Sequence, residues 1–145
     1  MDTIKAKVLL VDDEADFVDS LSKRLEVRGL KVFTATRGQK AIDLLDDETF
    51  DIIVLDLAMP GMDGLKTLQH IKEKDVDAEI VMLSGHGDVK STTEAMKLGA
   101  TDFLEKPVDL PDLLEKIAEA REKRILVMEK HAKKKIDDIL QSKPW

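Results

Sequence analysis

Short continuous runs of apolar residues, each ending at a polar side chain, limit the folds open to this chain more than any other feature. The three clearest runs are Val8–Val11, Ile52–Leu55 and Ile80–Leu83. A run without apolar–polar alternation is typical of a strand that is buried on both faces. Lys31–Ala35 and Asp102–Glu105 also have strand character, so five strands are predicted.

Helical patterns fill the intervals between these strands. The apolar stripe of Phe17, Leu21 and Leu25 stops at Gly29, a residue that commonly ends helices. The later stripes are Ala41, Ile42 and Leu45, then Leu65, Leu68 and Ile71, and a thinly apolar helix over 88–98. Five βα units with short connections predict an α/β fold, in which a parallel sheet carries helices on both faces.

Candidate start signals accompany the later helices. Thr36 and Gln39 have the spacing of a capping box before the second helix. Asp88 is placed to cap the helix over 88–98, and Asp109 to cap the last helix, whose first turn contains Pro111. Before the third helix, a stretch rich in turn-forming residues predicts a loop that includes Pro60, Gly61 and Gly64.

Length and composition exclude several classes of protein. The 145 residues correspond to one domain. The chain has no cysteine, which excludes disulfide scaffolds, zinc–thiolate sites and thiol catalysis. No apolar run reaches the length of a membrane span, and the N-terminus lacks a signal-peptide pattern, so we expect a cytoplasmic protein with no membrane partner.

Charge divides the chain into two parts. Residues 1–120 carry a net charge of −11, and residues 121–145 carry +4. The acidic part is expected to be the folded domain and not to bind nucleic acid directly. Helical character continues beyond residue 120, so residues 121–145 are expected to form a basic helical C-terminal extension.

A weak heptad pattern runs along this extension. Four residues repeat every seven positions: Ala118, Ile125, Ala132 and Ile139. The companion positions are only half apolar: they are Leu114, Arg121, Met128 and Lys135. Two interpretations remain open, namely a solvated, frayed helix and a helix that dimerises or binds a partner.

Polar side chains follow the strands and are expected to meet at one edge of the sheet. They are Asp12 and Asp13, Thr36, Asp56, Ser84 and Lys106. In open parallel sheets, ligands bind outside the carboxyl ends of the strands. Three neighbouring carboxylates repel one another, and a divalent cation relieves that conflict. Oxygen ligands suit a hard ion, so Mg²⁺ is the predicted cofactor.

The same residues favour phosphoryl chemistry. A carboxylate at Asp56, beside the metal, is able to attack a phosphorus centre and form an aspartyl phosphate. Mg²⁺ neutralises charge on a transferring phosphoryl group, and Lys106 would add a compact positive charge. The Ser84 hydroxyl would donate a hydrogen bond to a phosphoryl oxygen.

This constellation resembles the receiver domain of two-component response regulators, over residues 5–120. The matching stretches are Val8–Glu14, Val54–Gly64, Leu83–Gly87 and Gly99–Pro107. The resemblance is greatest to receivers of the nitrogen-regulation and transcription-activator type. It implies a flavodoxin-like fold, a five-stranded sheet in the order 2-1-3-4-5, here followed by an extended C-terminal helix.

The resemblance also implies a role for individual residues. Asp56 would be the phosphoacceptor, supplied by a histidine kinase or a histidine phosphotransfer protein. Mg²⁺ would be held by Asp13, Asp56 and the backbone carbonyl of Ala58, with Asp12 acting through a metal-bound water. Lys106 would pair with the phosphoryl group, ahead of a cis bond to Pro107.

Four more implications concern switching and phosphate lifetime. Ser84 would move toward the phosphate, and Phe103, otherwise an ordinary core aromatic, would turn inward behind it. Ala58 and His86 would tune the lifetime of the phosphate, although a histidine flanked by glycines is also a common loop residue. Phosphorylation would then alter the surface of residues 88–120 for partner binding or dimerisation.

The expected protein is a signalling phosphoacceptor and not an enzyme, with no attached effector domain. A homodimer would form through the C-terminal helix or the 88–120 face. One alternative is a metal-dependent phosphatase, but such enzymes commonly place a second Asp where this chain has Ala58. Another is a flavin-binding domain on the same architecture, which the 3% aromatic content disfavours.

Overall fold

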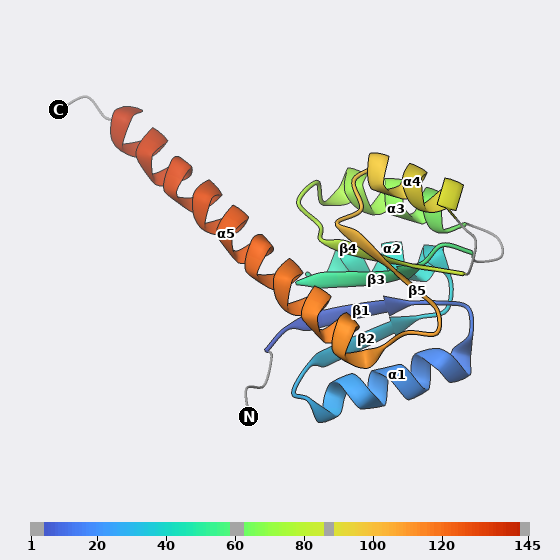
Figure 1. The fold of residues 1–145 in the computed structure, drawn as a ribbon. Coiled ribbons are helices and arrows are strands. Elements are labelled where there is room, and N and C mark those ends of the chain that lie inside the picture. The colour runs from blue at the N-terminus through green and yellow to red at the C-terminus, as the bar shows by residue number, and fades with distance from the viewer. Residues whose placement is uncertain (1–4, 59–62, 86–88, 143–145) are drawn as a thin grey trace.

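The computed structural model describes residues 5–58, 63–85 and 89–142, and in it strands and helices alternate along the chain (Figure 1). The strands are β1 (Lys7–Val11), β2 (Lys31–Ala35), β3 (Ile52–Asp56), β4 (Ile80–Ser84) and β5 (Asp102–Glu105). The helices are α1 (Ala15–Val27), α2 (Gly38–Asp47), α3 (Gly64–Lys74), α4 (Val89–Lys97) and α5 (Leu110–Ser142).

The five strands form one parallel sheet in the order β2-β1-β3-β4-β5. This confirms the predicted flavodoxin-like arrangement. The register pairs Val11 with Leu55, and Asp56 with Leu83. The carboxyl ends of the three central strands therefore lie side by side at one edge of the sheet.

Side-chain alternation along the strands builds two separate cores. Leu9, Leu55 and Met82 point to the face that α2, α3 and α4 cover. Leu10 and Val54 point to the opposite face, which α1 and the beginning of α5 cover (Figure 1). Because both faces are buried, the central strands carry continuous apolar sequences, as the pattern predicted.

The predicted capping box is wrong by one position. Helix α2 begins at Gly38, so its N-cap residue is Arg37, whose side chain makes no capping hydrogen bond. Thr36 then lies one residue before the cap, and Gln39 is too early for the reciprocal bond that a capping box requires. The Gln39 side chain instead donates to Asp43 Oδ1 at 2.9 Å, within the helix.

Gly64 is also placed differently, as the first residue of α3 and not in a loop. Asp63 caps this helix, since its Oδ1 accepts a hydrogen bond from the Lys66 N–H at 2.8 Å. A Cβ atom on Gly64 would lie only 2.4 Å from the backbone oxygen of Asp56. The glycine thus allows α3 to start directly against the end of β3. Pro60, Gly61 and the predicted cap Asp88 lie outside the described residues.

Helix α5 is continuous for 33 residues, and only its beginning packs against the domain. Its buried residues are Leu113, Ile117, Ala120 and Arg124. Beyond them the helix projects away from the sheet (Figure 1). The last helix starts as predicted, with the Asp112 N–H donating to Asp109 Oδ2 at 3.3 Å. None of the helices in the described residues is both long and apolar enough to cross a membrane.

Candidate phosphoacceptor site

Asp12 and Asp13 follow the last residue of β1. Asp12 is only 2% exposed, and its backbone N–H donates to the carbonyl of Ala35, which prolongs the pairing with β2. Its Oδ1 accepts a hydrogen bond from the Glu14 N–H at 2.9 Å. Asp13 is exposed. At the end of β1, the Asp12 carboxylate is therefore buried and the Asp13 carboxylate faces solvent.

Asp56 is the last residue of β3 and is 5% exposed. The Ala58 N–H donates to its Oδ1 at 3.4 Å, and the start of α3 packs on its backbone at Gly64. The position of Asp56 is fixed on three sides by β1, β4 and α3. Such a fixed carboxylate has little freedom to turn away from its neighbours.

The three carboxylates lie close together. One ligand oxygen from each of Asp12, Asp13 and Asp56 lies within 4.8 Å of the others. Burial raises the pKa of the Asp56 carboxyl from an ordinary 3.8 to about 6, and the negative charges of Asp12 and Asp13 add to this rise. Lys106 and the Ala58 N–H counteract it only in part. The cluster therefore carries more negative charge than its own surroundings balance.

Lys106 follows β5 and directs its ammonium into the cluster. Its Nζ lies 2.6 Å from Asp12 Oδ2 and 3.7 Å from Asp56 Oδ2. The contact with Asp12 is a close ion pair whose approach falls outside the angles of a hydrogen bond. Burial alone would lower the pKa of the Lys106 ammonium, but its carboxylate partners outweigh burial and raise it. Lys106 therefore stays charged. The peptide bond between Lys106 and Pro107 is cis.

Two further residues contact this ammonium and carried no predicted role. Glu14 Oε1 lies 3.2 Å from Nζ of Lys106, and the ring centroid of Phe17 lies 4.7 Å from it. The ring face attracts a cation, and Glu14 adds a negative charge. The only signal for Glu14 was its place in the acidic run after β1, while Phe17 was read simply as part of a helical stripe.

Ser84 and Phe103 both line a cavity next to the cluster. Ser84 ends β4 and is 2% exposed, whereas Phe103 on β5 is 41% exposed. Both line a cavity of about 540 Å³, together with Val89 and Met96 of α4. An aromatic ring on the rim of a cavity of this size has space to move inward.

The other candidates divide into two groups. Thr36 is exposed and has no polar contact with the residues of the cluster, all of which the structure describes, and Ala58 is exposed beside Asp56. His86 lies outside the described residues. The structure therefore brings together the carboxylates and Lys106, and places Ser84 and Phe103 at the adjoining cavity.

The cluster fits a magnesium ion by its donor chemistry. Its potential ligands are all carboxylate oxygens, the type that Mg²⁺ prefers. Burial and the neighbouring charges of Asp12 and Asp13 raise the pKa of Asp56, and a divalent cation at this point would favour its ionised form. Asp13 is exposed, which leaves room for the water molecules that Mg²⁺ usually keeps.

Comparison with known proteins points to one family. A family model described as the response regulator receiver domain matches residues 8–118. The C4-dicarboxylate transport transcriptional regulatory protein DctD of Pseudomonas aeruginosa is 37% identical over 125 residues, which cover 86% of this chain and 27% of DctD. The transcriptional regulatory protein FixJ of Bradyrhizobium diazoefficiens is 40% identical over 107 residues, which cover 74% of this chain and 52% of FixJ.

A solved structure gives the same result. The crystal structure of NtrX from Brucella abortus matches with a TM-score of 0.82 and 32% identity. The match covers 88% of this chain and 30% of the NtrX chain. This chain therefore spans about half of FixJ and less than a third of DctD or NtrX.

Proposed function

This chain belongs to the response regulator receiver domain family of two-component signalling, and on that premise we propose that Asp56 is its phosphoacceptor. One observation carries the proposal: a buried carboxylate at the end of the central strand lies with two more carboxylates and one ammonium. The donor would be a phosphohistidine on a histidine kinase or a histidine phosphotransfer protein, in the cytoplasm.

The proposed reaction is a transfer between two side chains. An oxygen of the Asp56 carboxylate attacks phosphorus, the new O–P bond forms, and the N–P bond of the donor breaks, so that the imidazole leaves. The attack needs the ionised carboxylate, and a pKa of about 6 keeps Asp56 ionised at neutral pH. Lys106, which already contacts Asp12 and Asp56, is placed to meet the added negative charge.

Asp13, Asp56 and the carbonyl of Ala58 would hold Mg²⁺, with Asp12 acting through a bound water. The ion would supply positive charge against the transferring phosphoryl group. Lys106 pairs more closely with Asp12, at 2.6 Å, than with Asp56, at 3.7 Å, and Asp13 is exposed, which supports Asp13 and Asp56 as the direct ligands.

Phosphorylation would switch the surface formed by residues 88–120. We propose that the Ser84 hydroxyl donates to a phosphoryl oxygen and that Phe103 fills the cavity that both residues line. Helix α4 buries only Thr92 and Ala95 in the core, so shifting it costs little free energy. The switch is thus a shift between two packings of the same cavity wall.

The chain is proposed to be a signalling acceptor without enzymatic turnover. Ala58 is exposed beside Asp56 and has no side-chain group that could direct a hydrolytic water. The aspartyl phosphate should therefore not be unusually short-lived, with His86 as a second tuning position. Repeated release of phosphate from small phosphomonoesters would instead support the phosphatase alternative.

Intact-mass spectrometry after incubation with acetyl phosphate and Mg²⁺ tests the acceptor assignment. We expect one phosphoryl adduct on the parent protein and none on Asp56→Asn or without Mg²⁺. Asp47→Asn is the matched control, because Asp47 is an exposed carboxylate at the end of α2, and it should keep the adduct. An adduct on Asp56→Asn would refute the assignment.

Residues 1–120 and 121–145 are proposed to have separate roles. The acidic domain would receive the phosphoryl group, and the extension would contact a protein partner, foremost a second copy of this chain. Exposed apolar residues along the projecting helix support this: they are Ile125, Leu126, Met128, Ile136, Ile139 and Leu140. Deleting residues 121–145 should leave the phosphoryl adduct intact and lower the ratio of the sedimentation mass to the mass of one chain from two to one. The same ratio in the parent and in the shortened protein would remove the dimer through the extension from the proposal.

A further inference from the structure

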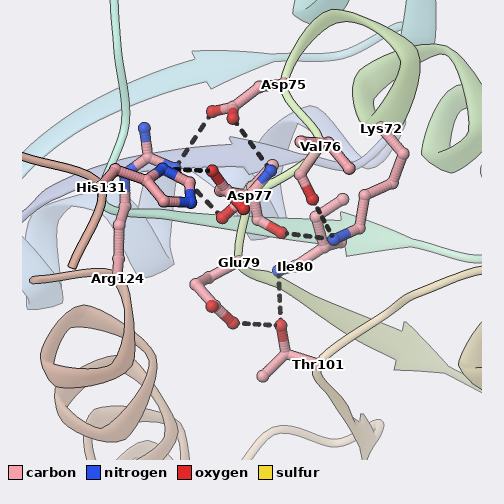
Figure 2. A network of polar contacts seen from close by, with 10 residues as sticks. Lys72, Asp75, Val76, Asp77, Glu79, Ile80, Thr101, Arg124 and His131 are labelled. Carbon is pink, nitrogen blue, oxygen red and sulfur yellow. Dashed lines mark hydrogen bonds and ion pairs between the residues drawn. The ribbon is translucent and has the colours of Figure 1, made fainter. Parts of the chain in front are cut away.

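A polar cluster fastens helix α5 to the domain at the edge of the sheet opposite the acidic cluster. Figure 2 shows Arg124 of α5 reaching the connection between α3 and β4. Its Nη1 donates to Asp75 Oδ2 at 3.0 Å and to the backbone oxygen of Asp77 at 3.2 Å. Two turns further along, Nδ1 of His131 lies 3.5 Å from Asp77 Oδ2. We call Arg124, Asp75 and Asp77 the clasp.

The α3–β4 loop, which contains Asp75 and Asp77, is held by several hydrogen bonds of its own. The second oxygen of Asp75 accepts from the Asp77 N–H at 3.1 Å. Nζ of Lys72 donates to the carbonyls of Val76 and Ala78, at 3.2 and 2.9 Å. The carbonyl of Asp75 accepts from the Ala78 N–H. Four consecutive carbonyls therefore have donors, and Arg124 supplies the one for Asp77.

Arg124 continues the buried face of α5 for one more turn. The buried positions 113, 117, 120 and 124 share one face of the helix, and Arg124 is the last of them. Arg124 is 7% exposed, and a buried guanidinium needs hydrogen-bonded partners, which the loop supplies among the described residues. Beyond this point α5 has no fully buried residue, and Val127 is half-buried in a hollow that Ala100 also lines. The last fully buried contact of the helix is therefore a polar one.

The apolar stripe of the extension points in a different direction from the clasp. Successive residues of an α-helix are turned by about 100°. Ile125, Ala132 and Ile139 therefore lie about a quarter-turn around the helix from Arg124 and His131. The contacts of the clasp leave this stripe exposed to solvent.

We propose that Arg124 is a positioning residue, whose attachment to the α3–β4 loop sets the direction of residues 125–142. Residues 125–142 then keep a fixed direction relative to the α3–β4 loop. A movement of α4 does not change that direction unless the contacts of the clasp break. The proposal goes beyond phosphorylation, because the clasp contains no residue of the acceptor site. It concerns how one chain carries its helix, whether or not two copies associate.

The test measures a distance within one chain. The protein has no cysteine, so Ser20→Cys on α1 and Lys134→Cys on the extension give two unique spin-label sites, both exposed. Labelled protein is diluted with excess unlabelled protein, so that distances between chains do not contribute. Pulsed electron spin resonance then gives the distribution of distances in the parent and in each variant.

Arg124→Gln and Asp75→Asn should both widen and shift this distribution. Amide exchange over residues 118–128 should accelerate about tenfold, the factor expected when a charge-assisted hydrogen bond is lost. Lys130→Gln is the matched control, since it removes a positive charge from an exposed position on the same helix, and it should match the parent.

An unchanged distribution in a folded Arg124→Gln or Asp75→Asn protein would overturn the proposal. Two variants are used because one of them could fail to fold for unrelated reasons. Both should still take up the phosphoryl adduct from acetyl phosphate. Loss of the adduct in the parent would count against the proposed function and leave the clasp untouched, so the two failures are distinguishable.

Discussion

Among the described residues, three carboxylates share a single nearby ammonium at the edge of the sheet where the strands end. At the edge where the strands begin, Arg124 and Lys72 each donate to two acceptors of the α3–β4 loop. The acceptor cluster leaves Asp56 with a pKa raised to about 6 by burial and by its acidic neighbours. At the clasp, both oxygens of Asp75 accept hydrogen bonds. The same residue types thus build a site that gains by binding positive charge and a joint that is already complete.

The largest difference in the free energy of unfolding should appear when a glycine at each edge of the sheet is replaced by alanine. In Gly64→Ala the new Cβ would meet backbone atoms of Asp56 and Leu57 at 2.4–2.5 Å, and backbone has little room to yield. In Gly99→Ala it would meet the flexible end of Lys72 at 3.0 Å, at a φ of +106°. We expect losses in the free energy of unfolding of roughly 3 kcal/mol for Gly64→Ala and about 1–2 kcal/mol for Gly99→Ala. Urea titration of both variants measures the order, and the reverse order would contradict the packing described at Asp56.

Removing one carboxylate charge should have opposite signs at the two edges. Without Mg²⁺ at pH 7.5, Asp56→Asn should raise the free energy of unfolding by about 2–3 kcal/mol, because it removes a carboxylate that folding makes harder to ionise. Asp75→Asn should lower it by about 1–2 kcal/mol, through a weakened bond to Arg124. Urea titration measures both changes in the free energy of unfolding. Changes of the same sign would contradict the difference described between the two clusters.

The pH dependence of the Asp56→Asn effect follows from the same pKa. The folded carboxyl ionises near 6 and the unfolded one near 3.8, so between these values the folded state holds the extra proton. The destabilisation by Asp56 is fully present above about pH 6 and disappears as the pH falls below 3.8. The advantage of Asp56→Asn should therefore shrink on acidification, as urea titrations between pH 7.5 and pH 4 would measure.

Magnesium should stabilise the protein through one edge only. At ten times its Kd, Mg²⁺ should raise the free energy of unfolding of the parent by about 1.4 kcal/mol. The gain should be largely lost in Asp13→Ala and fully retained in Asp75→Asn, whose altered side chain belongs to the clasp. Thermal unfolding with and without Mg²⁺ measures this. A full gain in Asp13→Ala would exclude Asp13 as a ligand.

The smallest effect should come from the contact that His131, outside the clasp, makes with Asp77. The side chain of His131 is 62% exposed, and its 3.5 Å contact with Asp77 is an ion pair only when the histidine is protonated. Exposed pairs contribute little, so His131→Gln should change the free energy of unfolding by less than about 0.5 kcal/mol. If His131→Gln lowered the free energy of unfolding as much as Asp75→Asn, then His131 and not Arg124 would be the main attachment of the helix.

The acceptor edge could be predicted from sequence because its residues follow strands. A continuous apolar run that ends in Asp places that carboxylate at the edge of a parallel sheet, and this located Asp56 and Asp12 without knowledge of any contact. Glu14 and Phe17 were not given their roles, because their contacts with Lys106 join residues about ninety positions apart. No local pattern reports such a contact.

The clasp was not predictable for the same reason. Arg124 is one of many basic residues in the extension, and its partner Asp75 lies 49 positions earlier, at the end of another helix. Charge counting therefore placed Arg124 in the basic helical extension without assigning it any contact. The capping box failed on a smaller scale, since a shift of one residue in the start of α2 removes the reciprocal bonds that define it.

The continuity of α5 makes the projecting part of the chain a lever. From Arg124 to Ser142 the helix extends about 27 Å, at 1.5 Å for each residue. A tilt of about 10° at Arg124 would then move the far end by about 5 Å, a displacement comparable to one helical turn. A small rearrangement at the α3–β4 loop would thus cause a larger displacement at the far end of the helix and of any partner bound there.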